Sequence, residues 1–165
     1  MGLKGDREII QDRIDVYLNE AADRGKIVVG STAASGAALD NVSQLGTVAA
    51  NPSGSVALGV LVGDMKDIDP TREFLNTQKD ETVKGGKMRL ITKGWIVTDN
   101  IETGTVTANE AAYVGNSGNF ATDAAIAGYG CAVTEESNKT SYQMVGRFQT
   151  TKDENGYARI GIDIA

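Results

Sequence analysis

The end of the chain carries the pattern that most constrains the fold, because two alternating segments flank a turn signal there. YQMVGRFQTT (142–151) and YARIGIDIA (157–165) are separated by KDENG, in which Asn155-Gly156 supplies the positive φ values that a tight turn needs. The second segment has one apolar face. Its members are Ala158, Ile160, Ile162 and Ile164. The chain is therefore predicted to close with an antiparallel β-hairpin.

Earlier segments show the same period of two. Val56–Gly63 alternates bulky residues with mostly small ones, which predicts a central strand packed closely on at least one side. Its bulky positions are Val56, Leu58, Val60 and Val62. Further strands are predicted at 26–30, 103–107 and 111–114, and the NSGN of 116–119 is a turn signal.

GGKMRLITKGWIVTDN (85–100) holds the chain's only tryptophan, Trp95, in a basic setting. The nearby cations are Lys84, Lys87, Arg89 and Lys93. Met88 and Leu90 alternate with cations, but Trp95 falls on the cations' parity, and Gly94 is placed where a bulge could reset the two faces. A stripe of this kind could contact phosphates, with Trp95 as a stacking platform. We interpret it as the outer side of a strand, and expect Trp95 to be substantially buried, in the core or between subunits.

The N-terminal segment has two interpretations. As a helix, Asp6–Arg24 gathers apolar residues on one face and ends at Gly25. That face consists of Ile10, Ile14, Tyr17, Leu18 and Ala21. As a strand, Ile14, Val16 and Leu18 alternate with polar neighbours. Both stay open, and residues 1–25 are expected to form a helix or an arm that takes its structure from a neighbour.

The remaining organisation follows from composition along the chain. Residues 31–55 are mostly small or polar and predict a long connector. Asp69 suits an N-cap and Pro70 a first helical position, which predicts a short helix through Leu75. Residues 26–165 are expected to form one domain. The fold class is thus mainly β, a small antiparallel β-barrel or sandwich with one or two short helices and an extended N-terminal segment.

Charge and composition exclude several classes of function. The chain has 165 residues, sixteen Lys and Arg against twenty-two Asp and Glu, and a net charge of −6, which argues against phosphate-driven nucleic-acid binding and against an anionic membrane. No histidine occurs, so Ser-His-Asp triads, Cys-His pairs and His-based metal sites are excluded. Cys131 is the only cysteine, so no intrachain disulfide forms, and we interpret it as a small buried hydrophobe.

Two groups in the middle of the chain resemble ligand sites. Asp64, Asp67 and Asp69 offer oxygen ligands to Ca²⁺, but the spacing lacks the glycine and the terminal glutamate of an EF-hand. Gly85–Lys87 is too short a glycine loop to cradle a phosphate. We interpret the acidic group as a helix cap and solvated turn, and the glycines as a turn before a strand.

Three carboxylates near strand ends could support glycoside hydrolysis if the fold brought them together. They are Asp99, Glu102 and Glu110. We interpret them as solvated surface charges. The sequence therefore predicts no catalytic, cofactor-binding or metal-binding residue, and the chain is not expected to be an enzyme.

Five phrases together resemble one protein family. They are YLNEAADRGKIVV (17–29), ANPSGSVALGVLVGDMKDID (50–69), GGKMRLITKGWIVTDNI (85–101), ANEAAYVGNSGNF (108–120) and MVGRFQTTKDENGYARIGIDIA (144–165). The set resembles virion structural proteins of tailed bacteriophages, of the small β-rich decoration or cement type that bind the outside of a capsid. The resemblance covers most of the chain from about Tyr17 onward.

The resemblance implies a protein that stabilises the capsid shell, made in the host cytoplasm and located on the capsid exterior. Its implied partners are the major capsid protein and copies of itself, for example as a homotrimer, with no cofactor, nucleic acid or membrane. A different class of function is a carbohydrate-binding or adhesion module that uses Trp95 and nearby tyrosines as a sugar platform. A small hydrolase built on the three carboxylates is the third hypothesis.

Overall fold

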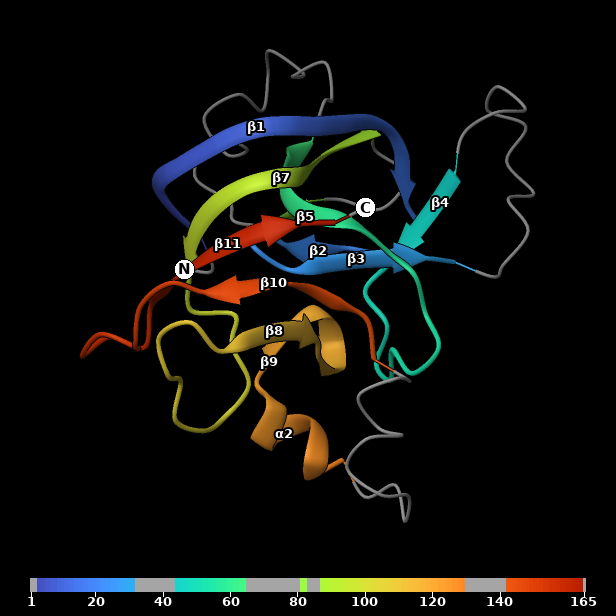
Figure 1. Ribbon diagram of the computed structural model, residues 1–165. Helices are drawn as coiled ribbons and strands as arrows, with labels where there is room; N and C mark the ends of the chain where they lie inside the picture. The colour runs from blue at the N-terminus through green and yellow to red at the C-terminus, as the bar shows by residue number, and fades with distance from the viewer. Residues whose placement is uncertain (1–2, 32–43, 65–80, 83–86, 130–141, 165) are drawn as a thin grey trace.

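The structure, a computed structural model, describes residues 3–31, 44–64, 81–82, 87–129 and 142–164. Its elements, drawn in Figure 1, are β1 (Leu3–Leu18), β2 (Ala22–Asp23), β3 (Ile27–Gly30), β4 (Gln44–Thr47), β5 (Ala57–Asp64), β6 (Glu81–Thr82), β7 (Lys87–Thr98), β8 (Ala111–Val114), η1 (Asn116–Gly118), β9 (Phe120–Ala121), α2 (Asp123–Ala127), β10 (Met144–Phe148) and β11 (Ala158–Asp163). The chain is mainly β, as predicted. Among the described residues, helix is confined to α2 and the 3-10 turn η1.

β7 is the strand around which the main sheet is arranged. One of its edges pairs antiparallel with β1 over nearly its whole length, from Leu3 opposite Thr98 to Tyr17 opposite Lys87. The other edge pairs antiparallel with β5 in its first half and with β11 in its second half. β7 therefore joins two groups of strands, and Figure 1 shows β1 and β7 as two long arched ribbons side by side.

The first group of strands closes into a ring. β1 pairs parallel with β4, β4 antiparallel with β3, β3 with β5, and β5 with β7, which returns to β1. A sheet that closes on itself is a barrel, so the expected barrel is present, with one parallel pair. Its buried cluster contains Val16, Leu18, Ala22, Val28, Leu58, Leu61, Met88 and Leu90. A Cβ at Gly46 would lie 2.5 Å from the Val28 side chain, so this crowded interior requires glycine there.

The second group continues from β7 in the order β11, β10, β8, β9. Its buried side chains pack against the outside of the barrel in a second cluster. The members are Ile27, Val29, Ala57, Val60, Val62, Ile91, Ile96, Val106, Ala112, Val114, Phe120, Val145, Phe148, Ala158, Ile160 and Ile162. The fold is therefore a small barrel with a further layer of sheet packed on it, and each layer supplies apolar side chains that the other buries.

The N-terminal segment is a strand, so its helix interpretation is wrong. β1 is sixteen residues long and pairs with β7 of the same chain. The strand is favoured because it brings Val16 and Leu18, both 0% exposed, into the barrel cluster together. On a helix these two residues would point in different directions.

Other predicted segments have mixed outcomes. The connector predicted at 31–55 contains β4, which completes the ring, while 32–43 lies outside the described residues. The helix predicted around Asp69 and Pro70 also lies outside them. The strand predicted at 103–107 is wrong, because this segment has no strand and Gly104 interrupts it with a φ of 141°.

β5 confirms the predicted central strand but not its faces. Val56 precedes the strand and is 64% exposed, and Leu58 packs in the barrel while Val60 packs in the second cluster. Against β3, the register shifts by one residue between Gly59 and Ala57. This β-bulge turns Leu58 to the opposite face from Val60.

The closing hairpin is confirmed. β10 and β11 pair antiparallel with Phe148 opposite Ile160, and the predicted apolar face is buried at Ile160 and Ile162. The connection is a longer loop than the predicted tight turn. Of the Asn155-Gly156 pair, Gly156 alone has a positive φ, of 84°.

Candidate functional site

The three carboxylates considered for glycoside hydrolysis have local contacts. Glu110 accepts a hydrogen bond of 3.0 Å from the backbone N–H of Thr107, which holds the turn before β8. Asp99 directly follows β7. Glu102 is partly buried and interacts with Tyr129, whose pKa is raised chiefly by burial. The contacts of Glu110 and Glu102 are those of turn and packing residues.

The acidic group considered for Ca²⁺ lies mostly outside the described residues. Asp64 is the last residue of β5, and Asp67 and Asp69 are beyond the described range, as are Cys131 and Lys84. Within the described ranges, no three Cys, Asp or Glu side chains are grouped so that they could hold a metal ion.

Trp95 is partly buried and held by two charged residues. Its indole N–H donates a hydrogen bond of 2.8 Å to the Glu8 carboxylate, and the Arg159 guanidinium lies 3.8 Å from the ring centroid. The expectation that Trp95 is buried in the core of the chain is therefore wrong. The indole is also not the fully exposed platform that the alternative required.

The predicted reset of the β7 faces occurs, but not at Gly94. β7 has one residue more than β1 at Thr92, since Gln11 faces Lys93 and the next residue, Asp12, faces Ile91. This bulge puts Lys93 and Trp95 on the side that Met88 and Leu90 occupy earlier in the strand. Gly94 instead faces a bulge of β1, and a Cβ there would lie 2.1 Å from the Glu8 carbonyl oxygen.

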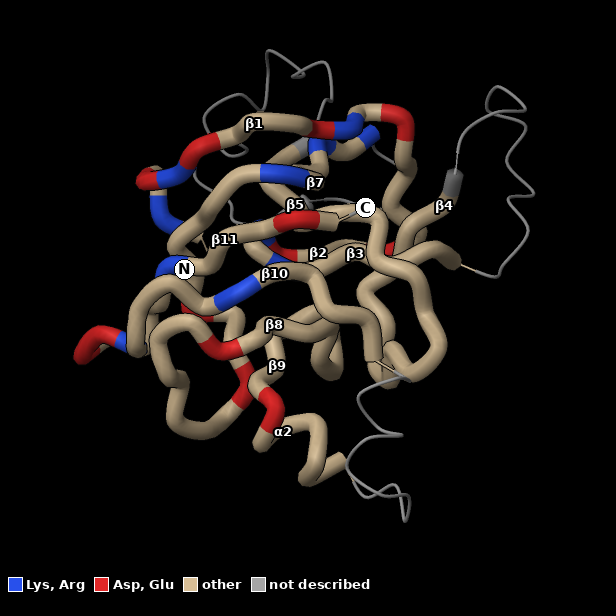
Figure 2. Tube along the Cα trace, in the orientation of Figure 1, with Lys and Arg blue, Asp and Glu red and all other residues tan. Residues whose placement is uncertain are grey.

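The cations of β7 do not lie on one face, because the bulge at Thr92 puts Lys93 on the side opposite to Lys87 and Arg89. Lys87 and Lys93 are exposed, as expected, Arg89 is partly buried, and two of the three are paired. Arg89 Nε lies 2.5 Å from a carboxylate oxygen of Asp12, and Lys93 Nζ lies 3.7 Å from one of Asp163. Figure 2 shows basic and acidic residues alternating along β1 beside this strand. On both faces the cations of β7 therefore lie among acidic residues, which suits a solvent-facing or subunit-facing side better than phosphate binding.

A groove with a volume of about 390 Å³ lies on the side of Lys93, over β1, β7, β11 and β10. Two of its lining side chains are apolar and exposed, Ile10 at 64% and Met144 at 45%. Lys93, Arg147 and Asp163 add charges of both signs. Exposed apolar side chains bordered by charges are typical of a surface that contacts another macromolecule.

Three glycines, Gly94, Gly146 and Gly161, line the groove together with the Gln149 side chain, which lies against Gly161. A Cβ at Gly146 would lie 1.9 Å from the Gly161 carbonyl oxygen, so β10 and β11 approach each other too closely for any side chain there. Trp95 faces Gly161 in register and thus borders these glycines. The close approach of the strands keeps this part of the groove free of large side chains.

Sequence reasoning missed the groove. Its signal was an isolated glycine inside each strand of the closing hairpin, at Gly146 and Gly161, which indicates close approach of another backbone. The alternating apolar residues of the hairpin predicted its buried face, which lies opposite the groove. The two glycines permit the close approach of β10 and β11 beside the groove.

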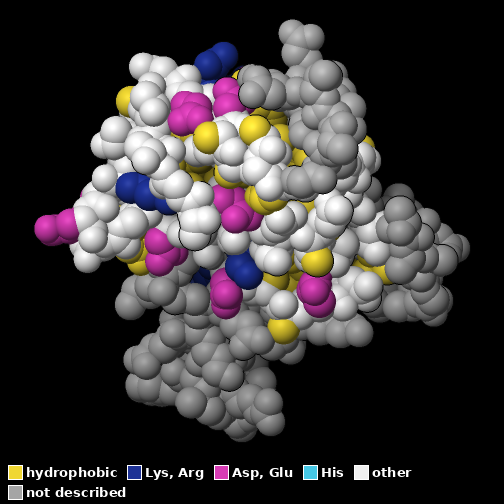
Figure 3. All heavy atoms as spheres, turned by 90° about the horizontal axis from the view of Figure 1, so that it is seen from below, with side chains coloured by type: hydrophobic (Ala, Val, Ile, Leu, Met, Phe, Trp, Pro, Cys, Tyr) yellow, Lys and Arg dark blue, Asp and Glu magenta, His cyan; other side chains and the backbone are white. Residues whose placement is uncertain are grey.

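Figure 3 shows the described part of the molecule from below, with no large patch of one charge. Acidic and basic side chains are scattered there between neutral ones. The groove face is the candidate functional site.

Neither a protein-family model nor a curated protein matches this chain. Among the described helices, none has the length and apolar character needed to cross a membrane. The family resemblance of the sequence phrases therefore stays a prediction.

Proposed function

We propose that the chain is a structural virion protein that binds the outer surface of a tailed-phage capsid and stabilises the shell. The observation that carries this proposal is the set of five phrases, which extends over most of the chain and resembles decoration proteins. The mainly β fold supports it, since these proteins are small and β-rich. The partners would be the major capsid protein and further copies of the chain, on the capsid exterior, with no cofactor and no turnover.

The groove is the surface that we assign to capsid contact. The hollow would receive a segment of the capsid protein, and exposed Met144 beside it offers an apolar anchor. A shallow groove gives a weak single contact. Many copies on one lattice act together, so weak contacts suffice for stable attachment.

The first test is the copy number of the chain in purified virions. Quantitative mass spectrometry should find it in numbers comparable to the major capsid protein. A chain that is found only in the soluble fraction of the lysate would contradict the proposal, and a few copies per particle would point to another virion part, such as a minor capsid component.

The second test is binding to capsids that lack the chain, measured by co-sedimentation. Met144→Asp places a charge in the groove and should weaken binding at least ~10-fold, because a desolvated charge costs much at an interface. Val56→Asp is the matched control, since Val56 is 64% exposed and does not line the groove. Equal binding by the two variants would move the contact away from the groove.

The carbohydrate-binding alternative receives less support from the geometry of Trp95. Sugar-binding tryptophans offer a free ring face, but Arg159 lies over one face of this ring. Glycan-array binding that is lost in Trp95→Ala would favour this alternative. The hydrolase hypothesis is tested by the amide variants of Asp99, Glu102 and Glu110.

A further inference from the structure

β1 has a long edge without a strand partner among the described residues. One edge pairs with β7 along the strand, whereas the other pairs with β4 at Val16–Leu18 alone. Along this open edge, Ile10 and Ile14 are 64% and 51% exposed. Natural proteins usually cover, shorten or pair such an edge, since its free N–H and C=O groups accept another strand.

We propose that β1 binds β1 of a second copy of the chain, antiparallel, across a two-fold axis between Ile9 and Ile10. In this register Arg7 faces the partner's Asp12, and Asp6 faces the partner's Arg13. The axis repeats each pair, so opposite charges face each other on both sides of it. Such directly opposite pairs stabilise an antiparallel ladder, whereas like charges destabilise it.

The charges of β1 select this register over its neighbours. A slip by one residue in one direction would place Arg7 against Arg13 and Glu8 against Asp12 of the second copy. A slip in the other direction would place Asp6 against Asp12. Within the described residues, Asp6 and Arg7 have no ion-pair partner of their own, whereas Asp12 pairs with Arg89 and Arg13 pairs with Asp15. A second copy would add Arg7 and Asp6 to these two existing pairs.

The backbone directions fit the same register. The Ile164 N–H donates to the Thr92 carbonyl across the β7–β11 pair, so by alternation Lys93 and Trp95 direct their backbone groups toward β1. Their partners on β1 are Gln11 and Glu8, which therefore bond inward. The residues next to these two are Asp12 and Arg7. Their backbone N–H and C=O groups therefore point outward, to the open edge of β1.

The bulge of β1 makes this possible. In a regular strand, Arg7 and Asp12 would direct their backbone groups to opposite edges, because an odd number of steps separates them. β1 has one residue more than β7 between Ile9 and Gln11, which brings both onto the open edge. The bulge lies at the proposed two-fold axis, so the irregular residues of both copies meet there and the pairs on either side of the axis are regular.

The same register would also cover the exposed side chains of Ile10 and Ile14. Ile14 would face the partner's Gly5, and nothing lies within 4 Å of the place where a Cβ of Gly5 would be. That space accepts the Ile14 side chain. Ile10 lies next to the axis, where the two copies would shield each other's side chain from water.

The test compares the oligomeric state of the full-length chain with that of charge-exchange variants by sedimentation velocity. Wild type should form a concentration-dependent dimer that weakens with added salt. Asp6→Arg combined with Arg7→Asp places like charges opposite each other in all four pairs, and should weaken self-association at least ~10-fold at unchanged net charge. Lys93→Asp with Asp163→Lys is the matched control, because it exchanges a facing pair away from the open edge and should dimerise as wild type does.

A complementary variant checks the register itself. Asp12→Arg combined with Arg13→Asp should also fail to self-associate, yet mixing it with the first variant restores all four opposite-charge pairs and should restore the dimer. A wild type that is monomeric up to about 1 mM, a first variant that dimerises normally, or a mixture that stays monomeric would each overturn the proposal. None of these results depends on capsid binding.

Discussion

The guanidinium of Arg159 lies 3.8 Å from the centroid of the Trp95 ring, and the indole N–H on the same residue donates to Glu8 at 2.8 Å. These side chains come from β11, β7 and β1, so one contact group connects three adjacent strands. Both charged groups interact with the tryptophan, which orders the exposed side of the sheet beside the groove.

Removing the Arg159 side chain should therefore loosen this group. Arg159→Ala is expected to lower the free energy of unfolding by about 1 kcal/mol, through the lost cation–π contact and the lost cover of the ring. Since Trp95 is the only tryptophan, its emission reports this site alone and should move to longer wavelength. Arg147→Ala is the control, because Arg147 bonds the Asn109 carbonyl and should leave the emission unchanged.

Two glycines of the groove should differ sharply in their tolerance of a methyl group. At Gly146 a Cβ would lie 1.9 Å from the Gly161 carbonyl oxygen, so Gly146→Ala must push two paired strands apart and should cost about 3 kcal/mol or more. At Gly161 the nearest atom is the side-chain amide of Gln149 at 2.7 Å, which can rotate away. Gly161→Ala should cost at most about 1 kcal/mol. Urea unfolding of the two variants measures both, and equal losses would contradict the strand geometry.

Strands with chemically different faces were predictable from the sequence. β11 matches its prediction because its alternation directly records which side is buried. The N-terminal segment fitted two periods equally well, and its burial in the barrel decided between them. Its burial requires pairing with β4 and β7, and the sequence of β1 alone carries no information about these partners.

The positions of the bulges could not be predicted, since a bulge is a relation between strands. The bulge at Thr92 exchanges the two faces of β7, because Gln11 and Asp12 of β1 pair with the residues on either side of Thr92. The groove is a similar case. Gly94 and Gly146 lie far apart in the chain, and sheet pairing through β11 brings them to one surface.

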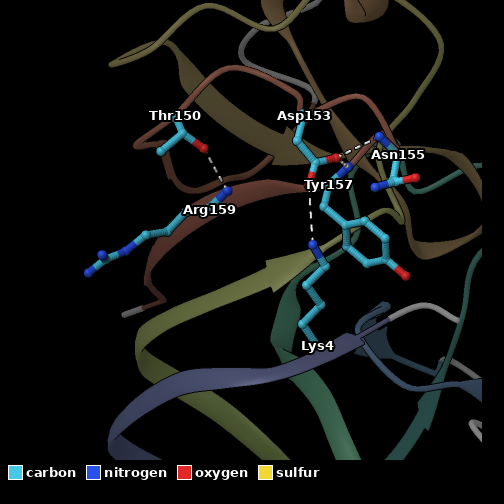
Figure 4. Close-up of polar contacts among 6 residues, drawn as sticks. All are labelled: Lys4, Thr150, Asp153, Asn155, Tyr157 and Arg159. Carbon is cyan, nitrogen blue, oxygen red and sulfur yellow. Dashed lines mark hydrogen bonds and ion pairs between the residues drawn. The ribbon is translucent and has the colours of Figure 1, made fainter.

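The loop between β10 and β11 is organised by one carboxylate, shown in Figure 4. Asp153 accepts hydrogen bonds from the backbone N–H groups of Tyr157 at 2.8 Å and Asn155 at 2.9 Å, and from Lys4 Nζ at 3.2 Å. Lys4 also lies 4.1 Å from the centroid of the Tyr157 ring. The loop is thus attached to the start of β1. The Tyr157 N–H is the first cause that lowers the pKa of Asp153, and Lys4 adds to it.

The lowered pKa predicts a dependence of stability on pH. An unfolded Asp titrates near pH 3.9, and the folded pKa of Asp153 lies below its ordinary value. The stabilisation is therefore fully present above the unfolded pKa and is lost as the pH falls through the folded pKa. The difference in free energy of unfolding between wild type and Asp153→Asn should be constant above about pH 5 and shrink below about pH 4. A difference that stays constant down to pH 2 would contradict the contacts at Asp153.

The raised pKa of Tyr129 predicts a loss of stability at alkaline pH. Its hydroxyl oxygen accepts a hydrogen bond of 3.3 Å from the Asn116 N–H, its ring centroid lies 5.5 Å from that of Tyr142, and its pKa is raised chiefly by burial. A raised folded pKa means that the unfolded chain, titrating near pH 10, loses this proton first. The free energy of unfolding should therefore fall as the pH rises above about 10.

Replacing Tyr129 with phenylalanine separates the two roles of the hydroxyl group. At pH 7, Tyr129→Phe should cost about 1 kcal/mol, because the Asn116 N–H loses its acceptor. Above about pH 10 the variant should lose stability less steeply than wild type, since the shifted phenol no longer titrates on unfolding. Urea unfolding between pH 7 and 11 gives both values for each protein. Parallel curves for the two proteins would show that Tyr129 is not the group whose burial sets the alkaline limit.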